Sequence, residues 1–279
     1  MQNKKYKIGI AGCGMVGGAV KKYFENKPNY EVFIYDKKGL GSMADINRAD
    51  YIYVCLPTPY VEGVGCDVGI IESVIEELTE YSRDTEGDII SKVFIIKSTV
   101  TPGTTQKLQD KYPQHKFLFN PEFLTEVTAD NDMAFPDRQI IGYTEQSYTI
   151  AKDVLQQLPL APYERIVKSE EAEMIKYFGN NWFALKVVFA NQMYDLCMKM
   201  GIDYEAVKDG AAADKRIGRT HLDILHKGGR GAGGKCLRKD LGATVEYARK
   251  NGLPLPLLEK AKEINDYLLT NFGRSKYVQ

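Results

Sequence analysis

The sequence contains few of the side chains that build metal centres. Its 279 residues include three histidines and five cysteines, and no two cysteines are spaced as CxxC. Zinc sites are usually built from such closely spaced ligands, so we expect no bound metal. The odd cysteine count and the absence of paired spacing also favour reduced thiols in a reducing compartment.

Net charge and long apolar runs are missing as well. The 37 lysines and arginines balance the 37 aspartates and glutamates, so no overall positive field would hold a nucleic acid. No apolar stretch approaches the roughly 18 residues of a membrane-spanning helix, and the amino terminus shows no signal-peptide core. We therefore expect a cytoplasmic protein that binds neither nucleic acid nor membrane. Hydrophobic residues, at 44%, are sufficient for a sizeable core.

Short apolar runs alternate with segments of helical period between residues 7 and 142. This alternation is typical of βαβ units and predicts an α/β fold with a doubly wound parallel sheet. Amphipathic crossover helices are expected over Val16–Glu25 and Ile70–Tyr81. The expected strands are Lys7–Ala11, Glu31–Tyr35, Tyr51–Leu56, Val93–Ser98, Phe117–Asn120 and Gln139–Gly142.

The strand pattern stops near residue 165, and helical periods follow. We expect a domain boundary here, with residues 1–168 forming the sheet domain and residues 169–279 a smaller all-helical domain. Ser169 can cap a long central helix whose first turn is acidic and whose pattern continues to about Met200. Further helices are expected over Tyr204–Ala212, Lys239–Lys250 and Pro256–Asn271.

The long central helix, roughly 45 Å at the usual rise, can span two domains or form a subunit contact. We expect a homodimer through it. The apolar positions that we interpret as core or dimer contact are Ile175, Phe178, Trp182, Phe183, Phe189 and Leu196.

A GxGxxG motif lies between the first expected strand and the first expected helix. Gly12 permits the tight turn, Gly14 lets the backbone approach a pyrophosphate, and Gly17 lets helix pack on strand. Met15 and Val16 begin the helix whose N–H groups would face the anion. By itself, the motif fits a glycine-rich turn without a ligand about equally well.

Asp36 favours the dinucleotide interpretation. It follows the second expected strand, about 20 residues beyond the motif, where a carboxylate can accept both ribose hydroxyls and repel a 2′-phosphate. The predicted cofactor is therefore NAD rather than NADP, bound in a Rossmann domain. Lys37 and Lys38 could favour a 2′-phosphate instead, but solvated loop lysines explain them better.

A second glycine-rich segment, Gly228–Gly234, precedes Cys236. Dense glycine disfavours regular structure and suits a loop whose backbone lies close to a ligand. The cations Lys235, Arg238 and Lys239 and the start of a helix would raise the thiolate fraction of Cys236, as in a nucleophilic cysteine. The alternative, a structural cysteine beside a glycine hinge, is our interpretation of the other four cysteines.

These residues resemble the UDP-glucose/GDP-mannose dehydrogenase family, whose signature GxGxGGxC followed by Lys-Asp appears here as Gly229–Cys236 and Lys239–Asp240. Family motifs also occur in the same order elsewhere in the chain. They are Val54–Pro59, Lys97–Thr104, Asn120–Glu126, Glu171–Asn180 and Arg216–Gly218.

The resemblance implies NAD-dependent oxidation of the primary alcohol of a nucleotide sugar to the uronate, in two hydride transfers, as in a UDP-glucose 6-dehydrogenase. Cys236 would carry a thiohemiacetal and then a thioester. Lys176 and Asn180, four apart on one helical face, would stabilise an oxyanion. The implied catalytic residues are Cys236, Lys176, Asn180, Asp240, Glu122 and Thr99.

The resemblance also implies ligand contacts. Beyond the glycine motif and Asp36, the implied cofactor contacts are Thr58, Thr99, Glu126 and Lys239. The implied substrate contacts are Glu122, Lys176, Asn180, Arg216 (from a neighbouring subunit) and Gly233. Asp240, Glu122 and Glu126 are the carboxylates that could activate the hydrolytic water.

The sequence departs from the family pattern in two respects. Family members continue into a second nucleotide-binding α/β domain, for which no strand pattern is present here, and Arg238 stands where the family usually has proline. One hypothesis is a shortened dehydrogenase whose dimer, or a separate chain, supplies the missing contacts. The alternatives are an NAD-binding scaffold with little turnover, which needs no Cys236, and a single-step hydroxy-acid or sugar dehydrogenase, which has no use for a thiol nucleophile.

Overall fold

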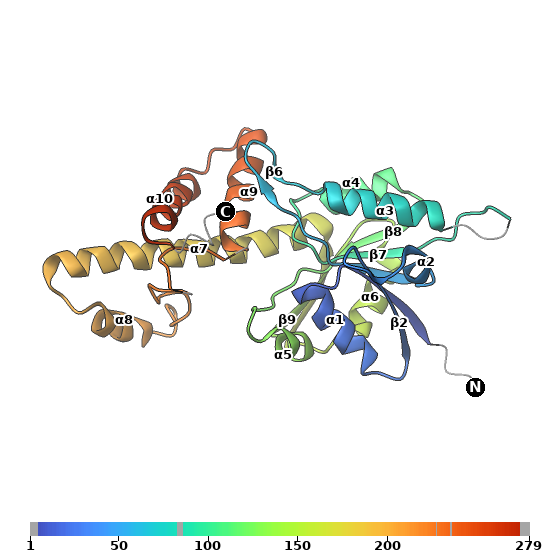
Figure 1. Ribbon diagram of the computed structural model, residues 1–279, viewed down its shortest axis with the longest axis horizontal. Helices are drawn as coiled ribbons and strands as arrows, with labels where there is room; N and C mark the ends of the chain where they lie inside the picture. Colours follow the sequence, from blue (N-terminus) through green and yellow to red (C-terminus); the bar gives the residue numbers. More distant parts are fainter. Residues whose placement is uncertain (1–4, 83–85, 227, 235, 274–279) are drawn as a thin grey trace. The chain divides into compact units, whose positions relative to one another are not determined.

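The computed structural model describes residues 5–82, 86–226, 228–234 and 236–273 (Figure 1). The chain forms two compact units. Unit 1 comprises Met1–Pro59 and Asp67–Lys176, and unit 2 comprises Tyr60–Cys66 and Tyr177–Gln279. The division thus falls inside the long helix that begins at Ser169. The short segment Tyr60–Cys66, which follows Pro59, also belongs to unit 2.

Unit 1 is built on an eight-stranded sheet in the order β10-β9-β8-β7-β4-β1-β2-β3. The β8–β9 and β2–β3 pairs are antiparallel and the other pairs parallel. The predicted doubly wound sheet is confirmed, although it is mostly rather than entirely parallel, and β3 and β10 extend its two edges. The strands are β1 (Tyr6–Ala11), β2 (Tyr30–Asp36), β3 (Leu40–Gly41), β4 (Tyr51–Val54), β7 (Val93–Ile96), β8 (Lys116–Phe119), β9 (Arg138–Tyr143) and β10 (Tyr163–Lys168).

Successive residues of the central strands face two different cores, because side chains alternate across a strand. In β7, Phe94 and Ile96 belong to one core and Ile95 to the other. Helices α2 (Met43–Ile46), α3 (Gly69–Tyr81) and α4 (Thr104–Lys111) cover the first. Helices α1 (Met15–Glu25), α5 (Ala129–Ala134) and α6 (Tyr148–Gln157) cover the second. The result is a three-layer α/β/α unit, with α3 and α4 above the sheet in Figure 1.

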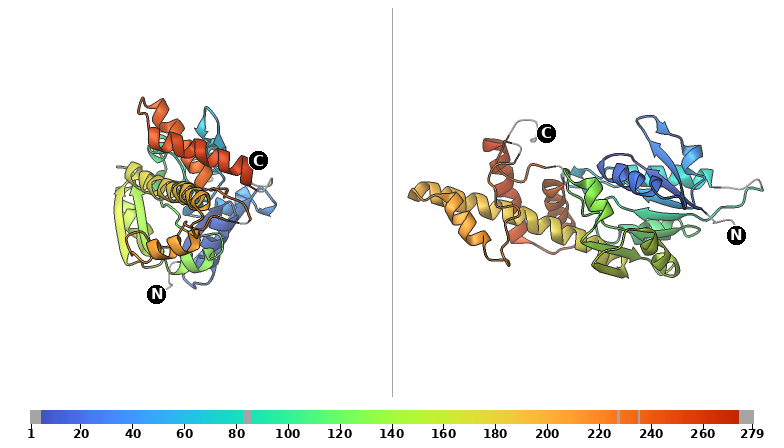
Figure 2. Two further views of the ribbon diagram at one scale, coloured as in Figure 1. Left: turned by 90° about the vertical axis from the view of Figure 1, so that its left-hand side faces the viewer. Right: turned by 90° about the horizontal axis from the view of Figure 1, so that it is seen from below.

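Helix α7 (Ser169–Met200) is one uninterrupted helix of 32 residues, as Figures 1 and 2 show. The predicted long central helix is confirmed at both ends. Its first turns are anchored in unit 1, where Ala172 and Ile175 pack against the core. Further along, Phe178 and Phe189 are 75% and 62% exposed, so they do not belong to the core of this chain.

Unit 2 is assembled from the rest of α7 with α8 (Tyr204–Ala212), α9 (Leu237–Lys250) and α10 (Pro256–Phe272). One of its cores joins three of these helices through Ala184 and Val188 of α7, Leu241 of α9 and Ala261 of α10. The predicted helices are therefore confirmed. No helix in the described part of the chain combines the length and apolar character that crossing a membrane requires.

A small hairpin, β5 (Tyr60–Val61) and β6 (Gly65–Cys66), also belongs to unit 2. Tyr60 Oη donates to Glu246 Oε1 of α9 at 3.5 Å, and Lys250 Nζ donates to the Val64 carbonyl at 3.0 Å. A Cβ atom on Gly242 of α9 would lie 3.0 Å from the Tyr60 ring. The hairpin is thus fixed to α9, although it lies far from that helix in sequence.

Candidate functional site

The loop after β1 has the geometry expected of a dinucleotide site. Gly12 has φ +90°, and a Cβ on Gly17 would lie 1.8 Å from the Gly12 carbonyl oxygen, so both positions require glycine. A Cβ on Gly14 would meet no atom within 4 Å, which leaves room for a ligand to approach the backbone. Gly14 also precedes α1 without a capping side chain, so the first N–H groups of α1 can face an anion.

Asp36, at the end of β2, is bound to that same loop. Its Oδ2 accepts from the Cys13 N–H at 2.7 Å and its Oδ1 from the Lys38 N–H at 2.9 Å. These two bonds, the Cys13 bond first, lower the pKa of the carboxyl, so Asp36 is ionised at neutral pH. An ionised carboxylate beside the glycine loop fits the ribose of NAD. Lys37 and Lys38 are exposed.

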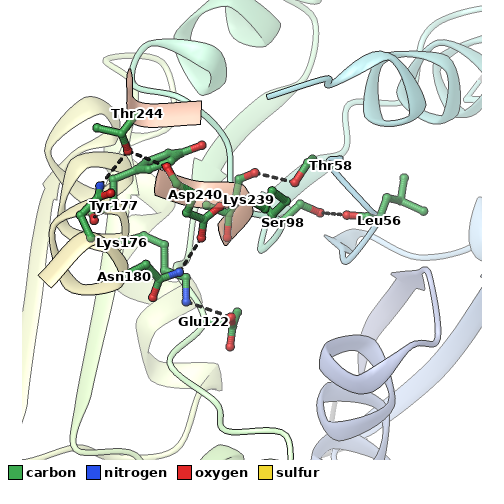
Figure 3. A network of polar contacts seen from close by, with 12 residues as sticks. Leu56, Thr58, Ser98, Glu122, Lys176, Tyr177, Asn180, Lys239, Asp240 and Thr244 are labelled. Atoms are coloured by element: carbon green, nitrogen blue, oxygen red, sulfur yellow. Dashed lines mark hydrogen bonds and ion pairs between the residues drawn. The ribbon is translucent and has the colours of Figure 1, made fainter. Parts of the chain in front are cut away.

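The loops after the adjacent strands β4 and β7 are joined by two hydrogen bonds (Figure 3). Thr58 Oγ1 donates to the Thr99 carbonyl at 2.7 Å, and Ser98 Oγ donates to the Leu56 carbonyl at 2.7 Å. These loops lie at the carboxyl ends of parallel strands, where open α/β sheets bind ligands. The structure therefore brings together Thr58 and Thr99, two of the predicted cofactor contacts.

Glu122, in the loop after β8, forms a buried ion pair with Lys176 of α7. The Nζ to Oε1 distance is 2.9 Å, and both side chains are less than a tenth exposed (Figure 3). The other carboxylate oxygen, Oε2, accepts from the Leu124 N–H at 2.8 Å. Lys176 is therefore not on the solvated face of α7.

Two buried residues near this pair have no predicted role. Lys97 and Asn120 follow β7 and β8, and the Lys97 ammonium donates to Asn120 Oδ1 at 2.7 Å. Burial lowers the pKa of Lys97. Asn120 Nδ2 donates onward to the Ile140 carbonyl at 2.9 Å. Both residues lie within the motifs quoted above, but lysine and asparagine are mostly surface residues, so sequence alone does not indicate their burial.

Glu173, one turn before Lys176 on α7, is fully buried. Its carboxylate accepts from the N–H groups of Gly103 at 2.6 Å and Thr105 at 2.8 Å, and from Thr105 Oγ1 at 2.7 Å. Burial raises its pKa to about 7, opposed by these hydrogen bonds. Glu173 thus fixes the start of α4, and the Thr99–Gly103 loop before it, to α7.

In unit 2, Asp240 is the centre of a second polar cluster (Figure 3). This fully buried carboxylate accepts from Asn180 Nδ2 at 2.5 Å through Oδ2 and from Lys239 Nζ at 2.5 Å through Oδ1. The Asp240 carbonyl accepts from Thr244 Oγ1 at 2.7 Å, and Asn181 Nδ2 donates to that hydroxyl at 2.7 Å. Asn180, Lys239 and Asp240 were predicted, whereas Asn181 and Thr244 were not.

Cys236 lies at the amino end of α9 and is exposed. Its carbonyl accepts from the Asp240 N–H at 2.9 Å, so Cys236 and Asp240 are one helical turn apart. The predicted nucleophile and the predicted carboxylate are therefore adjacent on α9, and Lys176 and Asn180 are likewise one turn apart on α7. Lys235, one of the predicted flanking cations, lies outside the described residues.

Other predicted ligand residues are on the surface. Glu126 is exposed in the loop before α5. Arg216 is 90% exposed, and its guanidinium binds Asp214 two residues away at 2.6 Å. Gly233, half-buried, donates its N–H to the Gly231 carbonyl at 3.0 Å. Both Glu126 and Arg216 are exposed, and their roles stay predictions.

Comparison with known proteins identifies the family. A model of the UDP-glucose/GDP-mannose dehydrogenase family, NAD binding domain, matches residues 39–158, and the model of the same family's central domain matches residues 170–267. The chain belongs to the UDP-glucose/GDP-mannose dehydrogenase family. The resemblance predicted from the motifs is confirmed, and NAD is the cofactor of the matched amino-terminal domain.

Two curated relatives carry the same name. UDP-glucose 6-dehydrogenase TuaD of Bacillus subtilis is 32% identical over 248 residues, which cover 83% of this chain and 51% of that protein. UDP-glucose 6-dehydrogenase of Pseudomonas aeruginosa is 33% identical over 233 residues, which cover 78% and 48%. The chain therefore spans about half the length of the curated relatives that it matches.

Solved structures agree with this assignment. A UDP-glucose dehydrogenase from the archaeon Pyrobaculum islandicum has a TM-score of 0.80 and 25% identity, covering 95% of this chain and 69% of that one. A 3-hydroxyisobutyrate dehydrogenase of Mycobacterium tuberculosis has a TM-score of 0.70 and covers 95% of its own chain, but at 15% identity it shares the fold alone.

The structure explains how the family's usual proline can be replaced by Arg238. The Arg238 Nε lies 3.2 Å from Asp266 Oδ1 of α10, and Lys262 binds the other oxygen of Asp266 at 3.0 Å. The arginine therefore ties α9 to α10 within unit 2. This contact gives Arg238 a structural role within unit 2.

Proposed function

We propose that this protein oxidises the primary alcohol of a nucleotide sugar, of the UDP-glucose type, to a carboxylate, reducing two NAD per sugar. The observation that carries the proposal is the exposed Cys236 one turn before the buried Asp240, whose carboxylate is bound by Asn180 and Lys239. The names of the similar proteins support this class of substrate.

In the first oxidation the alcohol carbon loses a hydride and its hydroxyl loses a proton, which gives an aldehyde. The glycine loop and Asp36 would hold NAD, which would supply the hydride acceptor for each oxidation. Glu122 is available to take the hydroxyl proton, directly or through water. The Lys176 ammonium and the Asn180 amide would stabilise the developing oxyanion.

In the second oxidation the Cys236 thiolate adds to the aldehyde carbon, and the carbonyl oxygen takes up a proton, which gives a thiohemiacetal. Loss of that proton and of a hydride from the same carbon leaves a thioester. Water then attacks the thioester, the carbon–sulfur bond breaks, and the carboxylate and the thiol are released. Asp240, on the same face of α9 as Cys236, can accept a proton from this water.

We also infer a homodimer formed through α7. Phe178, Trp182, Phe189 and Leu196 follow each other at spacings of four and seven residues, and they are 75%, 55%, 62% and 51% exposed. An apolar stripe of this kind favours a protein contact. A dimer would also give the exposed Arg216 a neighbouring subunit to reach.

Because the proposed nucleophile is a thiolate, the reducing cytoplasm suits this enzyme.

The test is the number of NADH molecules released per sugar, with UDP-glucose, GDP-mannose and related nucleotide sugars as substrates. We expect two NADH per sugar for the wild type and no uronate from Cys236→Ser. Cys197→Ala, which alters a buried thiol of unit 2, is the control and should still yield two. One NADH per sugar would indicate a single-step dehydrogenase instead. NAD binding without turnover on any sugar would indicate a scaffold.

A further inference from the structure

Arg230, in the glycine-rich segment before Cys236, has a side chain that is largely but not fully buried. It is 11% exposed, and its Nη2 lies 2.8 Å from Asp195 Oδ1 of α7. Its Nε donates to Asn191 Oδ1 at 2.8 Å, and Nη2 also donates to the Asn191 carbonyl at 3.3 Å. A planar guanidinium can bind several acceptors at once in this way, so Arg230 fixes this segment to α7.

The same residue binds α10. The Arg230 N–H donates to the Phe272 carbonyl at 3.2 Å. Its guanidinium carbon lies 4.8 Å from the centroid of the Phe272 ring and 5.1 Å from that of Tyr194 on α7. Cation–π contacts of this length are favourable, so the side chain is held between aromatic rings of both helices.

A second attachment follows two residues later. The Ala232 N–H donates to Asn265 Oδ1 of α10 at 2.7 Å, and Asn265 is 1% exposed. Gly231 lies between the two attachments and has φ +86°. A Cβ atom at this position would lie 3.2 Å from atoms of Asn265 and of Leu268. The backbone from Arg230 to Ala232 is therefore fixed on α7 and α10.

The chain becomes fixed again at Cys236, through the hydrogen bond between its carbonyl and the Asp240 N–H. Gly233, Gly234 and Lys235 lie between the two fixed regions, and Lys235 is outside the described residues. Glycines add no side-chain contacts of their own and allow many backbone conformations. The attachments of Arg230 and Ala232 thus set where the segment that leads to Cys236 begins.

We propose that Arg230 is a positioning residue for Cys236, which holds the glycine loop on α7 and α10 so that the thiol lies at the amino end of α9. The consequence for turnover rests on the proposed function, whereas the consequence for the thiol itself does not. Loss of the attachment would free the start of the glycine loop and loosen the hold on the first turn of α9, where the positive end of the helix stabilises the thiolate.

The experiment compares Arg230→Met and Arg230→Lys with the wild type. Lys208→Met is the matched control, because Lys208 is also a buried cation of unit 2, with a side chain 5% exposed and paired with Glu205 and Asp223. Three quantities are measured for each protein: the unfolding temperature, the rate of Cys236 alkylation and steady-state turnover. Alkylation by iodoacetamide is followed by peptide mass spectrometry from about pH 6 to about pH 10.

For Arg230→Met we expect alkylation of Cys236 near neutral pH to slow by about fivefold and the pH profile to move to higher pH. The kcat should fall by roughly tenfold, with the KM for NAD unchanged within about twofold. Arg230→Lys should give intermediate values. Lys208→Met should change only the unfolding temperature.

The proposal is overturned if folded Arg230→Met has the wild-type alkylation profile, or if Lys208→Met shifts that profile equally. If Arg230→Met does not fold, the Arg230→Lys profile decides in the same way. Should the wild type turn over no nucleotide sugar, the proposed function fails, but the alkylation profiles still test Arg230 because they need no substrate.

Discussion

Glu122 and Lys176 form an ion pair of 2.9 Å whose two side chains are only 8% and 7% exposed. The pair joins the loop after β8 to α7, so two segments far apart in sequence depend on one contact. Each charge is compensated inside the protein, and removal of either one leaves the other buried without its partner.

Lys176→Met should therefore destabilise the protein by about 3 kcal/mol. Glu122→Gln should be destabilising as well. In the double variant, Glu122→Gln with Lys176→Met, neither charge is stranded, so the loss should be smaller than the sum of the single losses. Urea unfolding of the four proteins measures this coupling, and additive losses would contradict it. Turnover should be lost in all three variants.

The Asp240 carboxylate accepts from the Asn180 amide and the Lys239 ammonium, one on each oxygen. In Asp240→Asn the new side chain can accept through only one atom. We expect kcat to fall by about a hundredfold, while Cys236 remains open to alkylation because it lies on the surface. Asp223→Asn, which alters a carboxylate paired with Lys208 in the same unit, is the control. A kcat within about threefold of wild type for Asp240→Asn would exclude it from the chemistry.

Asp36→Ser removes the carboxylate at the end of β2 and its bond to the Cys13 N–H. Because hydrogen bonds to a charged group contribute about 1.5–3 kcal/mol, the affinity for NADH should fall by at least about tenfold. Discrimination against NADPH should fall with it. Fluorescence titration with both cofactors measures the two effects, with Asp50→Asn as control. Unchanged discrimination would argue against the ribose contact.

Glu173 should make stability depend on pH. Burial raises the pKa of its carboxyl from the ordinary range to about 7, so the folded state disfavours the charged form. The protein is then most stable below the pKa that Glu173 has in the unfolded state. Its stability decreases as pH rises through the pKa of the folded state, by up to about 3 kcal/mol. Glu173→Gln cannot ionise, so its unfolding free energy should decline less between about pH 5 and about pH 8. Parallel profiles in urea titrations would refute this.

Phe178→Asp combined with Phe189→Asp should convert a dimer into a monomer, because both side chains lie on the exposed stripe of α7 and charges are disfavoured in an interface core. Sedimentation velocity measures the change. Leu257→Asp, at an equally exposed apolar position of α10, is the control and should leave the assembly unchanged. A wild type that sediments as a monomer would contradict the inferred dimer.

The elements that follow a strong periodic pattern could be predicted from sequence. Helix α7 begins at Ser169 and ends at Met200 as expected, because its pattern is long and its first turn is acidic. Strand β10 could not be predicted from sequence, because Tyr163–Lys168 is an edge strand with an alternating polar sequence and no fully buried residue. The two-residue strands of the β5–β6 hairpin are too short to carry a pattern at all.

The residues of the candidate site also differ in how well the sequence predicts their roles. Cys236 and Asp240 lie in a motif whose residue types indicate their chemistry, and the structure places them one turn apart. Lys97 and Glu173 look like ordinary surface charges in the sequence, because burial of a charged residue depends on distant parts of the chain. Arg230 is a similar case, since its acceptors come from α7 and its aromatic neighbours from both α7 and α10.

The hairpin of residues 60–66 has a consequence for biosynthesis. It packs on α9, which is translated much later, so this piece of unit 2 leaves the ribosome long before its packing partner exists. A truncated polypeptide ending at residue 176 would carry the hairpin without α9, and one starting at residue 177 would carry α9 without the hairpin. Neither unit can therefore be obtained complete from one continuous stretch of the gene.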